Sequence, residues 1–175
     1  MRLAASNIAW RPQWRNEAYK LMAESGFTGL EIAPSLLFAD AEDPFAPSIR
    51  MIHTVQHEIQ TVDLKIVSMQ SLFYGVENAA LLGNTCKHAI FVHRMKQAID
   101  LAGKLNVPNI VFGSPKQRRI PKNMALNEAY DRATETFKKL ALHAENAGTR
   151  IAIEPCPVVY GTNFLNTFEE AYNFV

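Results

Sequence analysis

The sequence contains few cysteines and no glycine-rich turn near its start, and each shortage argues against a class of protein. Its two cysteines, Cys86 and Cys156, stand far apart and match no metal-binding or redox spacing. Residues 6–10 follow the first strand-like segment without a single glycine. A doubly wound nucleotide binder usually places its glycine-rich phosphate turn at that point. The sequence therefore indicates neither a cysteine-held metal nor a nucleotide-binding turn.

An excess of charge of one sign and long apolar runs are also missing. The formal net charge is +1 and no long basic run is present, which argues against a nucleic-acid partner held by phosphate contacts. The densest basic cluster, residues 116–119, is predicted to be a solvated loop or at most a local phosphate contact. No secretory or membrane-spanning segment is evident, and Met1 leads at once into a strand-like stretch. We therefore expect a cytoplasmic protein with no targeting peptide and no membrane contact.

What the sequence does contain is a regular alternation of strand-like and helix-like segments. Hydrophobic residues make up 48% of the chain and no low-complexity linker interrupts them, so residues 1–175 are predicted to form one domain. Five short apolar segments have the composition of buried strands: residues 3–5, 30–33, 66–69, 109–112 and 151–154. Strict alternation of strand and helix predicts parallel βα units with right-handed crossovers.

Apolar residues recur at helical spacing between and after these strands. The successive stripes begin near Trp14, Ile52, Phe91 and Leu126, and Asn166 or Thr167 is the predicted N-cap of a short last helix. The five histidines all fall on helical segments: His53, His57, His88, His93 and His143. His53 and His57 have a chelating spacing, but the glutamate of a zincin motif is missing between them. We therefore expect surface or packing histidines.

Two architectures fit this pattern. One is a (β/α)8 TIM-type barrel of which the chain supplies about the first five βα units, because a full barrel needs about 250 residues. The other is a five-stranded doubly wound parallel sheet, which suits the length better. Polar residues where each strand gives way to its loop favour the barrel: Asn7, Glu31, Gln70, Ser114 and Glu154.

Glu154 is the most informative of these polar residues. The apolar run Ile151–Ile153 reads as a buried strand, and such strands rarely finish on a carboxylate. A carboxylate there is costly unless a cation, a hydrogen-bond donor or a metal meets it. Two interpretations remain open: Glu154 is a ligand for a hard divalent cation, or it pairs with a neighbouring lysine or arginine.

Two segments resemble the xylose-isomerase-like barrels, the sugar phosphate isomerase and epimerase superfamily. One is Gly29-Leu-Glu-Ile-Ala33; the other is Ile151-Ala-Ile-Glu-Pro155, followed by Gly161–Leu165 and a helix opening at Thr167. The resemblance implies a partial barrel that is truncated at its C-terminus. It also implies one divalent ion (Mn²⁺, Mg²⁺, Co²⁺ or Zn²⁺), held by Glu154, which would also be catalytic. In such barrels an Asp, a His and a Glu from strands six to eight complete the ligand set.

The implied activity is a metal-dependent isomerisation or epimerisation of a small sugar or sugar phosphate. Candidate substrate-binding residues, each of which could instead have a structural role, line the expected mouth: Asn7, Trp10, Glu31, Gln70 and Asn163. For Glu31 the alternative is a salt bridge to a base such as Lys65. The superfamily's DNA-repair endonucleases need histidines at the ends of strands three and four. This chain has Gln70 and Gly113-Ser114 at those places, which argues against a repair endonuclease. We also expect a homo-oligomer. The alternative function is a non-catalytic partial barrel that self-associates or pairs with a missing C-terminal half.

Overall fold

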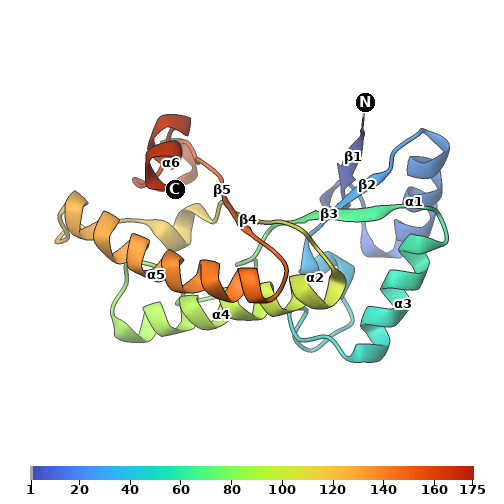
Figure 1. Ribbon diagram of the computed structural model, residues 1–175, viewed down its shortest axis with the longest axis horizontal. Coiled ribbons are helices and arrows are strands. Elements are labelled where there is room, and N and C mark those ends of the chain that lie inside the picture. The colour runs from blue at the N-terminus through green and yellow to red at the C-terminus, as the bar shows by residue number, and fades with distance from the viewer. Residues whose placement is uncertain (1) are drawn as a thin grey trace.

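The computed structural model describes residues 2–175 and contains a sheet of five parallel strands (Figure 1). The strands are β1 (Ala4–Ser6), β2 (Gly29–Ile32), β3 (Lys65–Met69), β4 (Ile110–Phe112) and β5 (Ile151–Ile153). Each overlaps one of the segments predicted from composition, and their parallel pairing confirms the predicted βα units.

Helices separate the strands in the predicted alternation. They are α1 (Arg15–Glu24), α2 (Pro34–Leu37), α3 (Ile49–Gln60), α4 (Thr85–Leu105), α5 (Leu126–Asn146) and α6 (Phe168–Phe174). Thr167 is the N-cap of α6, where its side chain and that of Glu170 form a capping box. The short helix α2 and four 3-10 turns, η1 (Asn7–Ala9), η2 (Pro12–Trp14), η3 (Pro115–Arg118) and η4 (Val158–Tyr160), were not predicted. Across residues 2–175, no helix has the length and hydrophobicity needed to cross a bilayer.

Strand order decides between the two predicted architectures. The order along the sheet is β1-β2-β3-β4-β5, without reversal. Right-handed crossovers between neighbouring strands in this order place their helices on one face, and α3, α4 and α5 lie together on one side of the strands in Figure 1. A doubly wound sheet would reverse its order and carry helices on both faces. The chain is therefore a partial TIM-type barrel, and the doubly wound alternative is wrong.

The two faces of the sheet differ in burial. Leu30 and Ile32 of β2 point toward the helices and are completely buried, as is Phe112 of β4. On the opposite, inner face Gly29 lies so close to β1 and β3 that a Cβ there would stand 2.8 Å from the Cβ of Ala4. Val67 on the same face is 39% exposed. The helices therefore cover the outer face, while the inner face, which would line the interior of a closed barrel, is partly open.

Aromatic side chains connect the helical layer to the end of the chain. The rings of Phe91 and Phe112 meet edge to face with centroids 5.5 Å apart, and Phe112 contacts Phe137 of α5 at 5.2 Å. Phe137 in turn meets Phe174 of α6 at 5.8 Å. Such pairs add specific geometry to the hydrophobic burial of the core. The packing fixes α6 beside α5 and places the loop between β5 and α6 near the end of β4.

Candidate active site at the mouth of the partial barrel

The carboxyl ends of β1, β2 and β3 bring three polar side chains together. Gln70, directly after β3, donates from Nε2 to the carboxylate of Glu31 and, at 3.1 Å, to Oγ of Ser6. Lys65 pairs in register with Gly29, two residues short of Glu31, and forms no ion pair with Glu31 in the described structure. The two candidate residues Glu31 and Gln70 are therefore hydrogen-bonded to each other at the ends of β2 and β3.

Glu154 stands at the carboxyl end of β5 with its carboxylate free. Its backbone N–H donates to the carbonyl of Phe112 at 3.1 Å, which extends the pairing of β4 and β5 by one residue. Its Oε2 lies against Gly113, where a Cβ would overlap it. The side chain is exposed, and within residues 2–175 no side chain donates a hydrogen bond to the carboxylate or forms an ion pair with it. The predicted lysine or arginine partner therefore forms no ion pair in the described structure, although the buried guanidinium of Arg118 lies near enough to interact with Glu154 electrostatically.

Two of the predicted substrate-binding asparagines hold loops together. Asn7 is 3% exposed; its Oδ1 accepts the N–H of Ala33 at 2.7 Å and its Nδ2 donates to the carbonyl of Ala33 at 3.2 Å. Asn163 makes the same pair of bonds with Ile120, at 2.8 Å and 3.2 Å. Each side-chain amide thus bonds a backbone N–H and carbonyl, as another backbone segment would. The Oδ1 of each asparagine already accepts a hydrogen bond. Trp10 packs edge to face on Tyr19 at 6.2 Å.

Arg118 is a residue of this region that sequence analysis missed. The prediction that residues 116–119 are a solvated cluster is wrong for Arg118, which is completely buried, while Lys116 and Arg119 are exposed. Burial lowers the pKa of its guanidinium, and the nearby Cys156 and Glu154 oppose that effect. Its acceptors are carbonyls 36 and 47 residues further along the chain, so no local pattern could have identified it.

Glu154 is the side chain at this mouth that could bind a divalent ion. The exposed oxygens of Glu154, with only Gly113 beneath them, fit one position of a hard-cation site. Residues 2–175 contain no group of three or more His, Cys, Asp or Glu side chains placed to hold a metal. The five histidines lie in α3, α4 and α5, as predicted. The described residues therefore fit one ligand of a metal site and supply no complete one.

Comparison with known proteins gives a family and a fold. The family model described as xylose isomerase-like TIM barrel matches residues 19–175. No curated protein matches the chain in sequence.

Several solved structures share its fold. The apo form of 3-keto-D-glucoside 4-epimerase YcjR from E. coli is 18% identical, with a TM-score of 0.71, over 99% of this chain and 63% of that chain. D-psicose 3-epimerase from Clostridium cellulolyticum H10, solved with D-tagatose, is 18% identical (TM-score 0.74; 99% and 58%). D-allulose 3-epimerase from Methylomonas sp., in complex with D-allulose, is 19% identical (TM-score 0.73; 99% and 57%). The chain thus spans 57–63% of the length of these three proteins.

Proposed function

The chain belongs to the xylose isomerase-like TIM barrel family, and from that premise we propose that it carries part of the active site of a metal-dependent sugar isomerase or epimerase. The observation that supports the proposal is the free carboxylate of Glu154 at the end of β5, exposed above Gly113. The solved structures of similar fold include enzymes named as 3-epimerases of psicose, ribulose and allulose. A small ketose is therefore the substrate class we propose, with a sugar phosphate as the alternative.

The chemistry is a proton transfer at a carbon next to a carbonyl group. A carboxylate removes the proton, the C–H electron pair moves into the adjacent carbon–carbon bond, and charge develops on the carbonyl oxygen. When bound, a divalent ion supplies the positive charge that stabilises this oxygen. Glu154 would hold that ion and, as a carboxylate, could also accept the proton. Protonation of the same carbon from the opposite face, by a second acid group, gives the epimer. Protonation of the former carbonyl carbon gives the isomer, and the proton of the neighbouring hydroxyl then passes to the former carbonyl oxygen.

Five side chains are proposed to line the sugar site, and they differ in whether their polar groups are still available to bond a sugar. Glu31 and Gln70 face the open inner side and can exchange bonds with sugar hydroxyl groups. Trp10 offers a ring at the end of β1. Asn7 and Asn163 already bond backbone groups, so their contribution is to hold the loops that carry the site.

Mn²⁺ is the probe that tests the proposal. We expect Mn²⁺ to broaden the amide NMR signals of Gly113 and Glu154 in the 175-residue chain. The binding should be weak, because residues 2–175 contain no group of three or more ligating side chains placed to hold a metal. The E154Q variant removes the charge at constant size and should abolish the effect. Equal broadening in wild type and E154Q contradicts the proposal, because the Mn²⁺ would then bind elsewhere.

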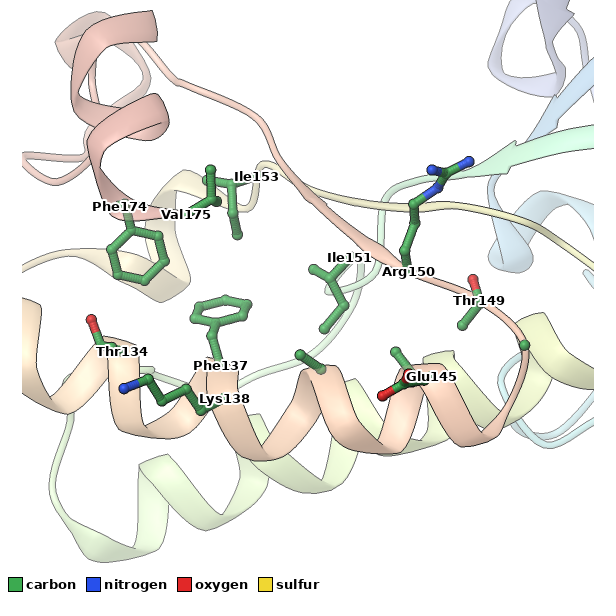
Figure 2. Close-up of a pocket in the computed structure, with 13 residues that line it drawn as sticks. Thr134, Phe137, Lys138, Glu145, Thr149, Arg150, Ile151, Ile153, Phe174 and Val175 are labelled. Carbon is green, nitrogen blue, oxygen red and sulfur yellow. The ribbon is translucent and has the colours of Figure 1, made fainter.

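The groove beside β5 supports a second candidate, a partial barrel that associates with a second copy of itself. β5 pairs with β4 alone among the described strands, and next to it lies a cavity of about 630 Å³. Figure 2 shows Phe137, Ile151, Ile153 and Phe174 pointing into the space between α5 and β5. Lys138 and Glu145 lie on its α5 wall.

These two charges favour a second copy as the occupant. They stand seven residues apart, two helical turns or about 10 Å, on one face of α5. In a two-fold dimer, if residue i of one chain contacts residue j of the other, then residue j of the first chain contacts residue i of the second. A lysine and a glutamate at two such positions therefore form two ion pairs of opposite charge. We expect a dimer in light scattering.

A further inference from the structure

Arg118 is a buried arginine whose hydrogen-bond acceptors are backbone carbonyls. Its Nη1 donates to the carbonyl of Glu154 at 2.7 Å, and its Nη2 donates to the carbonyl of Leu165 at 3.1 Å. Its Nε is also buried and has no partner within residues 2–175. Salt bridges in the described structure do not include it.

Burying an arginine in this position costs more free energy than burying an apolar side chain of similar size. Removing a guanidinium from water costs free energy, and the unpaired Nε adds the cost of an unsatisfied donor. A hydrophobic side chain of similar volume often replaces a buried charge without loss of stability. What arginine offers instead is a rigid, planar fork of donors that fixes two acceptors relative to each other.

The two acceptors are the two ends of the loop that follows β5. Leu165, at the far end, also accepts the backbone N–H of Cys156 through its carbonyl at 3.0 Å, and Nδ2 of Asn166 donates to the carbonyl of Cys156 at 2.8 Å. The guanidinium therefore sits where residues 154–156 and 165–166 meet. It closes the base of the loop.

The segment after β4 holds this loop at a second point. Ile120 lies two residues beyond Arg118, and its backbone N–H and carbonyl bond the side chain of Asn163. The same segment is tied to the β3–α4 connection, because the N–H of Leu81 donates to the carbonyl of Gln117 at 2.7 Å. Arg118 thus projects from a turn that is itself anchored.

Glu154 is consequently fixed by its backbone on both sides. Its N–H is held by the carbonyl of Phe112 and its carbonyl by Arg118, while its carboxylate remains free above Gly113. A metal ligand or base that acts in one geometry benefits from a backbone that is already ordered. The entropy cost of ordering it is then not incurred when the metal or substrate binds.

We propose that Arg118 is a positioning residue that fixes the backbone from which the Glu154 carboxylate projects toward a bound cation, by bridging the carbonyls of Glu154 and Leu165. The inference rests on the proposed function, since it assumes that Glu154 binds a divalent ion. Arg118 itself touches neither the ion nor the sugar.

The test compares two neighbouring arginines with Mn²⁺ alone as the probe. R118M removes the fork and keeps an apolar side chain of similar length, whereas R119M removes the same charge from an exposed position. We expect R118M to weaken the Mn²⁺-induced broadening of the Gly113 amide about threefold or more, and R119M to leave it unchanged. R118K, which retains one donor group, should recover part of the effect. Broadening near the exposed carboxylate of Glu169 should be the same in all variants.

Hydrogen exchange provides a readout that needs no metal. The amide of Cys156, bonded to Leu165, should exchange about tenfold faster in R118M, equivalent to about 1.4 kcal/mol, while the amide of Leu81 keeps its protection. If wild type shows no broadening that depends on Glu154, the proposed function fails, and exchange alone then decides whether Arg118 orders the loop. The inference is overturned if R118M behaves as R119M does in both measurements. It is also overturned if R118M speeds exchange at Cys156 and Leu81 alike without changing the Gly113 signal, because Arg118 would then be only structural.

Discussion

At the scale of single residues, the mouth of this partial barrel depends on amide and guanidinium groups that bond backbone. Asn7 and Asn163 each satisfy an N–H and a carbonyl of a neighbouring loop, and Arg118 satisfies two carbonyls. The sequence correctly placed the two asparagines in loops after β1 and β5. It could not show what they bond, because the partners lie 26 and 43 residues away.

Replacing Asn7 by alanine should destabilise the fold. The change would leave the N–H of Ala33 buried without a partner, which costs about 2 kcal/mol. The carbonyl of Ala33 would keep the backbone N–H groups of Leu36 and Leu37 as donors. We expect N7A to lower the free energy of unfolding in urea by that amount. The control is Ile8→Ala, a substitution at the adjacent, 55% exposed position. Equal stability of N7A and I8A would show that Asn7 is free to bind a ligand instead.

Asp43 should make the stability of the fold depend on acid pH. Burial tends to raise the pKa of its carboxyl, but the N–H of Phe45 and the guanidinium of Arg94, which both bond Oδ1, outweigh burial and lower it. Gln97 donates to the other oxygen at 3.1 Å. Because the pKa in the folded state lies below that of the unfolded chain, the stabilisation is complete above about pH 4 and disappears as the pH falls through the folded-state pKa.

Urea denaturation between pH 5 and pH 2 measures this effect. D43N should be less stable than wild type at pH 5, by about 1 kcal/mol for a partly exposed pair. The difference should shrink toward pH 2, where wild type has lost the charge. D40N, in the same connection and exposed, should follow the wild-type pH profile. A constant difference between D43N and wild type at every pH would exclude the ionised carboxylate as its cause.

At the scale of elements, the contact between α4 and α5 depends on a glycine. Gly103 faces the C-terminal end of α5, and a Cβ there would stand 2.9 Å from the carbonyl oxygen of Ala147 and 3.3 Å from its Cβ. Alanine in a helix is favoured over glycine by about 1 kcal/mol. The obstacle, however, is backbone, and overpacking of this kind costs about 1–3 kcal/mol.

We therefore expect G103A to be destabilising despite its better helix propensity. Thermal unfolding should show a lower midpoint, corresponding to a net loss of about 1 kcal/mol. K104A, the neighbouring exposed position on α4, should stay within about 0.5 kcal/mol of wild type. A rise in stability for G103A would mean that the end of α5 moves aside.

The elements themselves were largely predictable, because hydrophobic period and helix signals act over a few residues. The five strands, the helical stripes and the cap at Thr167 all follow from such local patterns. The short helix α2 was missed because four residues, Pro34–Leu37, carry too little periodicity. Strand order could not be read locally either, since a barrel and a doubly wound sheet use the same βα units. Only pairing between segments far apart in sequence separates them.

At the scale of the whole molecule, the edge of β5 that no other described strand pairs, and the groove beside it, are the features that favour a partner. A sheet edge with free backbone groups next to exposed apolar side chains favours association. A second copy that docks with α5 antiparallel to its counterpart would place Lys138 of one chain opposite Glu145 of the other, twice in each dimer. The arrangement makes a prediction that depends on charge, not on hydrophobicity alone.

Exchanging the two charges tests that geometry. K138E should weaken the dimer about tenfold or more, because it sets like charges opposite each other at two places. The double exchange K138E/E145K restores both pairs and should recover the wild-type dissociation constant in sedimentation equilibrium. K139E, next to Lys138 but outside the groove, should have no comparable effect. If K138E and the double exchange weaken the dimer equally, the two-fold pairing of α5 is wrong. If wild type is a monomer at the protein concentration used for the NMR titration, a second copy is not the occupant of the groove, and a segment of different sequence must cover β5.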